Sequence, residues 1–144
     1  MNKVLLVSGC AWAIAQATKT LIILMQKRRL DFSYFFSGGM PSSHSATVSA
    51  LAASVAMVEG FDSVAFAIAA ILAIVVMYDA AGVRRWVGRQ SIVLNHIMHE
   101  IGFRRPITEW EHDLREFIGH TPFQVIIGAI LGIVVALLWF TIAP

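Results

Sequence analysis

Residues 37–56 read SGGMPSSHSATVSALAASVA, in which a loop of glycine, proline and serine leads into a long run of alanine, serine and valine. The run has the composition of a membrane helix, but the ionisable side chain of His44 stands in its first turn. Ser42 or Ser43 can cap this helix, and the N–H groups and dipole at a helix start favour phosphate. We therefore predict an anion pocket with His44 as its acid, and the alternative is a plain cap at a membrane surface.

The two glycines that precede this helix extend the same hypothesis. Gly38 and Gly39 have no Cβ, so both can take positive φ angles and expose consecutive backbone N–H groups as a nest for an anion. Glycine, proline and serine are also common at any junction between a loop and a helix. Spacing alone therefore leaves the functional and the structural interpretation open.

The composition of the chain indicates whether it lies in a membrane or in water. Of its 144 residues, 58% are hydrophobic and 14% are charged, and the mean hydropathy is +0.73, whereas a soluble domain carries about 25% charged residues. We predict an all-α integral membrane protein with a single domain over residues 1–144, because no linker or repeat divides the chain. Cys10 is the only cysteine, so no intramolecular disulfide can form.

Four segments are candidates to cross a hydrocarbon core about 30 Å thick, which takes roughly 20 helical residues. They cover residues 4–25, 42–58, 63–81 and 121–142. The second is short and rich in alanine and serine, which suits close packing against other helices, and Gly128 and Gly132 give the fourth a similar small-residue stripe. The expected architecture is a bundle of about four transmembrane helices.

The polar region between the third and fourth segments favours two short amphipathic helices. Residues 90–101, QSIVLNHIMHEI, have a broad apolar face that is typical of a helix lying at the membrane interface. The second starts at Thr108, which has Glu111 three residues later in a capping-box pattern. The histidines of HIMHE match no strong metal site, and the arginines of this region can bind anionic lipid head groups.

Basic residues give the orientation. With four crossings, the connections after the first and third spans share one side, and they contain Lys27, Arg28, Arg29, Arg84, Arg85, Arg89, Arg104, Arg105 and Arg115. The positive-inside tendency places them in the cytoplasm and both termini outside. His44, Asp79 and His120 then lie on the cytoplasmic face, in what we expect to be a bacterial inner membrane.

A second histidine opens the last span. In residues 119–132, GHTPFQVIIGAILG, His120 stands at a helix start and Gln124 follows four residues later on the same face, where it can hold the imidazole. A neutral imidazole can attack phosphorus through one nitrogen while a neighbour holds the other. Two helix-start histidines on one face of the membrane favour a shared pocket.

These motifs resemble those of a known superfamily. PSSHS, residues 41–45, resembles the Pro-Ser-Gly-His motif of the type 2 phosphatidic acid phosphatases (PAP2), a superfamily that includes vanadium haloperoxidases. GHTPFQVIIGAILG is similar to the last motif of that superfamily, His-x-x-x-Asp followed by an apolar run. With YDAAGVRR, residues 78–85, and the small size, the chain resembles the divergent PAP2 branch of small membrane proteins.

The resemblance implies a PAP2-like core and a metal-independent lipid phosphatase of the acid phosphatase type, with no cofactor. His120 would be the nucleophile that forms a phosphohistidine, and His44 would protonate the leaving alkoxide. The substrate would be a lipid phosphate monoester or a polyprenyl diphosphate. Phosphoryl transfer depends mainly on positioning and charge stabilisation, and the groups we expect to bind the substrate are Lys19, Gly39, Ser42, Ser43, Arg84 and Arg85.

The chain departs from the superfamily pattern at several positions. Gln124 replaces the aspartate that orients the nucleophile, and Asp113-Leu114 stands where Ser-Arg is expected. Asp79, at the end of the third span, either replaces that aspartate or pairs with Lys19 or Arg84, since an isolated charge at membrane depth is costly.

The departures leave other functions open. The first is a catalytically weak or inactive protein that binds a lipid phosphate in the same pocket, and the second is an assembly subunit that packs with partners through its small residues. The expected partners are a phospholipid or polyprenyl phosphate and the membrane lipids, with no nucleic acid. A bundle of four spans is also compatible with a homodimer.

Overall fold

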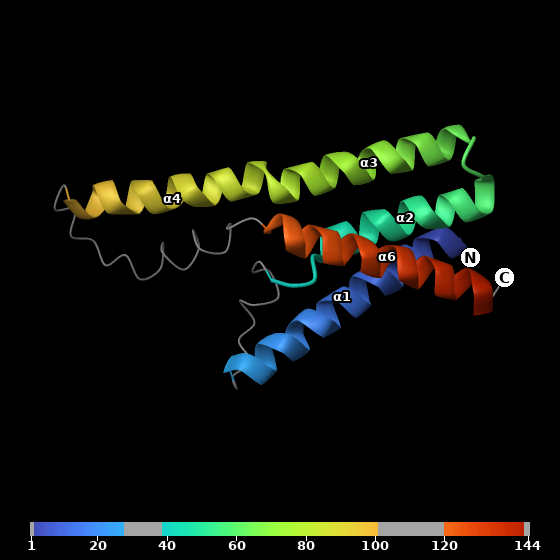
Figure 1. Ribbon diagram of the computed structural model, residues 1–144, viewed down its shortest axis with the longest axis horizontal. Coiled ribbons are helices and arrows are strands. Elements are labelled where there is room, and N and C mark those ends of the chain that lie inside the picture. Colours follow the sequence, from blue (N-terminus) through green and yellow to red (C-terminus); the bar gives the residue numbers. More distant parts are fainter. Residues whose placement is uncertain (1, 28–38, 101–119, 143–144) are drawn as a thin grey trace.

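The computed structural model describes residues 2–27, 39–100 and 120–142, and most of these residues are in helices. The helices are α1 (Lys3–Lys27), α2 (Ser43–Glu59), α3 (Val64–Ala81), α4 (Val83–Glu100) and α6 (Pro122–Ile142). Figure 1 shows their arrangement. The predicted all-α membrane fold is confirmed, while the predicted helix that starts at Thr108 lies outside the described residues.

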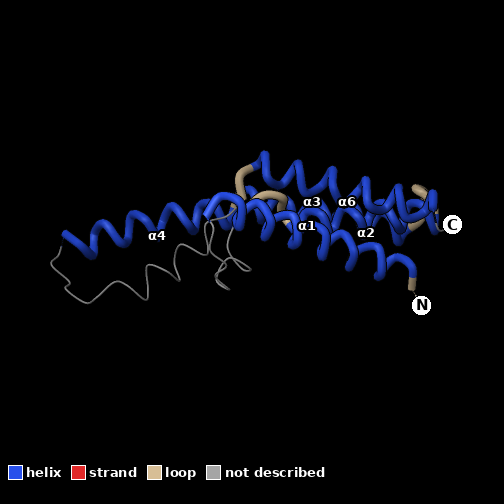
Figure 2. The backbone as a smooth tube through the Cα atoms, turned by 90° about the horizontal axis from the view of Figure 1, so that it is seen from below, coloured by secondary structure: helices blue, strands red, loops and turns tan. Residues whose placement is uncertain are grey.

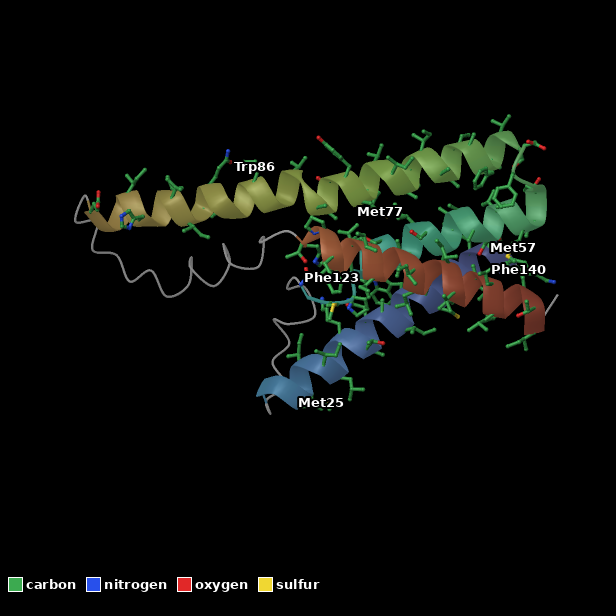
Figure 3. The ribbon with its side chains drawn as sticks, viewed as in Figure 1. Met25, Met57, Met77, Trp86, Phe123 and Phe140 are labelled. Carbon is green, nitrogen blue, oxygen red and sulfur yellow. The ribbon has the colours of Figure 1, made fainter. Side chains whose placement is uncertain are left out.

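Four of these helices, α1, α2, α3 and α6, form a bundle in which the chain direction alternates (Figures 1 and 2). Both termini lie at one end, and the starts of α2 and α6 lie at the other. Figure 3 labels Phe123 and Met77 at the end with the helix starts, and Met57 and Phe140 at the end with the termini. The alternating order is the one that the sequence predicts.

Helix α2 has the central place, because it contacts α6 most extensively and also packs on α1 and α3. Small side chains make this possible, and the buried hydrophobic core is largely alanine. A Cβ on Gly132 would overlap the carbonyl oxygen of Ala46, and one on Gly128 would overlap that of Ser42. We call this backbone-to-backbone contact between α2 and α6 the α2–α6 seam.

Three stretches of described helix are long and apolar enough to cross a membrane: Lys3–Met25, Val64–Leu94 and Pro122–Ile142. The expected second span corresponds to α2, which has only 17 residues and carries four buried serines. It packs on α1, α3 and α6, and all four of these serines are buried, whereas Met57 and Val58 near its end are exposed. Because α2 packs among other helices, it can lie alongside the membrane spans although it is shorter and more polar than they are.

The end with the termini has ordinary helix-ending chemistry. Gly60 ends α2 with a φ of 88°, a conformation that side chains disfavour, and its N–H donates to Ala56 O. Ser63 then caps α3 by accepting a hydrogen bond from the Phe66 N–H. The turn is therefore explained by its sequence, and the unusual features of the chain lie at the opposite end.

Helix α4 begins directly after Gly82 and continues away from the bundle in nearly the direction of α3 (Figures 1 and 2). The sequence predicts a helix over residues 90–101 only, so the observed element starts one and a half to two turns earlier. Trp86, which Figure 3 labels, lies in this additional part and is exposed.

Candidate functional site

The start of α2 is held by a buried serine cap. The Ser42 side chain is fully buried, and its oxygen accepts hydrogen bonds from the Ser45 N–H at 3.4 Å and the Ser45 hydroxyl at 3.0 Å. His44, two residues after the cap, has an exposed side chain. Of the two predicted caps, Ser42 is therefore the one that forms, and it orders the turn that presents His44.

The start of α6 is held by a reciprocal pair. The Thr121 N–H donates to Gln124 Oε1 at 3.0 Å, and the Gln124 N–H donates to Thr121 Oγ1 at 3.3 Å. This is a capping box, with Thr121 as the cap and Gln124 as the third helical residue. His120 directly precedes the box and is partly buried, with its Nδ1 buried. Gln124 Oε1 thus fixes the backbone next to His120, and its predicted hold on the imidazole remains a prediction.

The two helix starts are tied to each other. The Ser42 N–H donates to the carbonyl oxygen of Gln124 at 3.2 Å, and one turn further Gly128 lets α6 approach the Ser42 carbonyl. The result is that the rings of His44 and His120 lie 6.5 Å apart between centroids, with their planes inclined by 47°. The α2–α6 seam therefore brings together two histidines that are 76 residues apart in the sequence.

Lys19 lies near the loop that leads into α2, and only 4% of it is exposed. A Cβ on Gly39 would lie 3.1 Å from its Cδ and 3.2 Å from its Cγ, so the lysine stem passes directly over this glycine. The predicted positive φ at Gly39 is wrong, because Gly60 is the described glycine with that geometry. Gly39 is small to admit Lys19, and Gly38 lies outside the described residues.

The other predicted site residues are placed as follows. Ser43 is buried in the first turn of α2, and Asp79 is partly exposed in the last turn of α3, at the end of the bundle that holds both histidines (Figure 1). Arg84 and Arg85 begin α4, and their side chains are outside the described part of the chain. Ser42 is buried and its oxygen accepts the hydrogen bonds of the cap, and its predicted contact with a substrate stays a prediction.

Sequence reasoning missed two participants. Ser45, whose hydroxyl completes the buried cap, is one residue past His44 and reads as part of the alanine-serine run. The Thr121–Gln124 box has a recognisable threonine-x-x-glutamine pattern, but the spacing from His120 favoured a side-chain partnership instead. Knowing that the helix starts at Pro122 would have identified the box.

The fold and this site together define a helical membrane protein in which two histidines meet at the starts of neighbouring parallel helices, near a buried lysine. The chain belongs to the divergent PAP2 family, whose model matches residues 1–135. The family resemblance drawn from residues 41–45 and 119–132 is therefore confirmed.

Comparison with curated proteins gives a relative of the same kind. The chain is 41% identical to YuiD of Bacillus subtilis (strain 168), described as an uncharacterized membrane protein, over 94% of this chain and 92% of the relative. No solved structure matches the chain. Family, membrane association and helical fold are thus established, while reaction and substrate require an argument from the site.

Proposed function

We propose that the protein is a membrane phosphatase that hydrolyses a lipid phosphate monoester or a polyprenyl diphosphate through a phosphohistidine on His120. The single observation that carries this proposal is the 6.5 Å separation of the His44 and His120 rings. At that distance one phosphoryl group can lie within reach of both imidazoles, which is the geometry that a nucleophile and a general acid require.

Burial divides the two roles between the histidines. Nδ1 of His120 is buried, so we assign attack on phosphorus to its other nitrogen, Nε2. As the bond between phosphorus and the leaving oxygen breaks, the exposed His44 donates its proton to that oxygen. Water then attacks the phosphohistidine with His44 as base, which releases phosphate and restores both rings. Membership of the divergent PAP2 family supports this order of events.

Positive charge near the pocket supports the same assignment. Lys19 is buried against Gly39, and the first turn of α2 directs its backbone dipole toward the same end of the bundle. We assign Lys19 and the α2 N-terminus to the phosphoryl oxygens, with Ser43, Arg84 and Arg85 as further predicted contacts. Asp79 is the predicted carboxylate partner of Lys19 or of a histidine. The pocket is proposed to open to the cytoplasm of a bacterial inner membrane.

The test is phosphate release by the purified protein in vesicles, with phosphatidic acid and a polyprenyl diphosphate as the two substrates. His120→Ala is expected to abolish release, and His44→Ala to lower it by about 10²–10⁴-fold, the range for a general acid. His96→Ala, in an exposed histidine of α4, is the matched control and should leave the rate unchanged. Full activity in His120→Ala would refute the mechanism.

One observation favours a second function, binding without turnover. Gln124 stands where the superfamily motif has aspartate, and its Oε1 accepts from the Thr121 backbone, so it provides no carboxylate to balance an imidazolium charge. A protein that binds lipid phosphate without hydrolysis would bind vanadate saturably, lose this binding in His120→Ala, and release no phosphate. Gln124→Glu separates the two functions, because glutamate keeps the capping box and adds a carboxylate. Turnover that appears only in this variant would favour the binder.

A further inference from the structure

The helix that leaves the bundle poses a problem of length. The apolar stretch through α3 and α4 covers 31 residues, Val64–Leu94, and a straight helix of that length extends about 46 Å at 1.5 Å per residue. The hydrocarbon core is only about 30 Å thick. Since α3 alone supplies 18 residues to it, the apolar surface of α4 has to meet a different environment.

One face of α4 is apolar and lies open. Its side chains recur at helical spacing, and each is between 44% and 63% exposed: Val83, Trp86, Val87, Val93, Leu94 and Ile97. The other face holds His96, which is 3.4 Å from Glu100 in an exposed pair. Among the described helices the main neighbour of α4 is α3. A helix with these two faces lies parallel to a membrane, with its apolar face between the head groups and the acyl chains.

The charge of α4 favours a particular membrane surface. Arg84, Arg85 and Arg89 stand in its first two turns, and the first turn contains no acidic residue. Glu100, the one acidic residue of α4, is at the far end. Basic residues close to a membrane exit are attracted to anionic head groups, and α4 begins where the α3 span ends. Charge and position therefore both select anionic lipid over a second protein chain.

A break between the two helices is already present. Gly82 has φ −106° and ψ −83°, which are not helical values, and its N–H donates to the Tyr78 carbonyl oxygen at 2.8 Å. A Cβ at this position would come within 2.9 Å of that oxygen. Glycine thus permits the helix direction to change at residue 82.

We propose that α4 is an in-plane anchor that binds the surface of a membrane containing anionic phospholipid. In the structure α4 continues nearly along α3. On the membrane it changes direction at Gly82, its apolar face enters the boundary between head groups and acyl chains, and its first two turns meet the anionic head groups. The predicted interfacial helix covered residues 90–101, and anionic head groups were one possible partner of the arginines. The proposal adds the turns from Val83 and the break at Gly82, and it commits to that partner. It does not require catalysis at the histidines, although it gives Arg84 and Arg85 a second role beside their predicted contact with the phosphoryl group.

The first experiment measures how deeply each face of α4 is immersed. The full chain carries Cys10→Ser and a spin label at either Leu94→Cys or His96→Cys, which lie on opposite faces, in vesicles of phosphatidylglycerol and phosphatidylcholine. Collision with oxygen should exceed collision with a water-soluble nickel chelate at residue 94, with the reverse at residue 96. Strong nickel access at both positions would mean that α4 projects into water, and spin–spin broadening that vanishes on dilution with unlabelled chain would mean that a second copy covers it. Either result overturns the proposal.

The second experiment tests the lipid class with the same labels. In vesicles of phosphatidylcholine alone, residue 94 should be less deeply immersed, so the ratio of its oxygen collision rate to its nickel collision rate should decrease several-fold. The triple variant Arg84→Gln, Arg85→Gln, Arg89→Gln should give this lower ratio in both kinds of vesicle. If residue 94 were equally immersed in both kinds of vesicle when the three arginines are present, the proposal that α4 recognises anionic lipid would be overturned. Unchanged helicity by circular dichroism verifies that the variant is folded.

Discussion

The α2–α6 seam and helix α4 follow opposite principles in one small chain. Along the seam the backbones touch, and even the Cβ of an alanine at Gly132 would overlap the carbonyl oxygen of Ala46. Along α4 large apolar side chains such as Trp86 and Leu94 are more than half exposed. The seam fixes atoms relative to each other, whereas α4 presents a surface to its surroundings. The difference indicates that the geometry of the histidine pair depends on the seam rather than on α4.

The seam can hold α2 and α6 in a fixed position because it has no bulky side chains. Lipid provides little hydrophobic driving force between helices, so close backbone approach and interhelical hydrogen bonds have to hold them together. Here Gly128 and Gly132 allow the approach, and the Ser42 N–H bonds the Gln124 carbonyl across the helix starts. The contacts of Gly128 and Gly132 fall on Ser42 and Ala46, which are each two residues from His44, so packing and site are the same structure.

The largest effect is expected from filling the seam. Gly132→Leu places a branched side chain where a single Cβ already overlaps backbone, and neither α2 nor α6 can yield without losing contact. Overpacking of this severity should cost more than about 3 kcal/mol of unfolding free energy. Unfolding in detergent, followed by circular dichroism against temperature, measures the loss. The control is Gly9→Leu on α1, which has open space around its Cα and should remain folded. Equal stability of the two variants would show that the seam is not the tight contact described.

A smaller effect is expected at the end of the seam. Thr121→Ala removes the hydroxyl that accepts from the Gln124 N–H and should destabilise the helix start by about 1 kcal/mol. Because His120 is the neighbouring residue, phosphate release should fall further than this loss of stability explains. Thr121→Ser retains the acceptor and should behave as the unaltered protein. If Thr121→Ala and Thr121→Ser gave identical unfolding curves and identical rates of phosphate release, the capping box would have no part in positioning His120.

The sequence predicts the arrangement of the site better than its details. The two histidines could be placed together because each opens an apolar segment, and an even number of crossings between them returns the chain to the same side. The exposure of His44 and the burial of Lys19 depend on tertiary packing and could not be read in advance. Gly39 illustrates the limit, since its small size serves contact with a residue on another helix rather than a backbone conformation.

The same limit explains the errors at helix boundaries. Gln124 lies four residues from His120, which suggests a side-chain partner, but the helix begins only at Pro122 and so the spacing belongs to a cap. Likewise the arginines after Gly82 suggested a loop before the amphipathic helix, whereas the helix starts there. The local sequence pattern predicts that a helix exists. Packing against the neighbouring helix determines where that helix begins and which hydrogen-bond partner a side chain has.

The smallest effect is expected on α4, from Leu94→Ala. A fully buried leucine loses about 2–5 kcal/mol of stability on truncation to alanine, because contacts are lost and a cavity remains. Leu94 is 56% exposed, so the unfolding free energy of the bundle in detergent should change by less than about 0.5 kcal/mol. In anionic vesicles the same variant should weaken the binding of α4 to the membrane surface and leave the unfolding curve unchanged. A loss near that of a buried leucine would place α4 against the bundle and remove the contrast between the two regions.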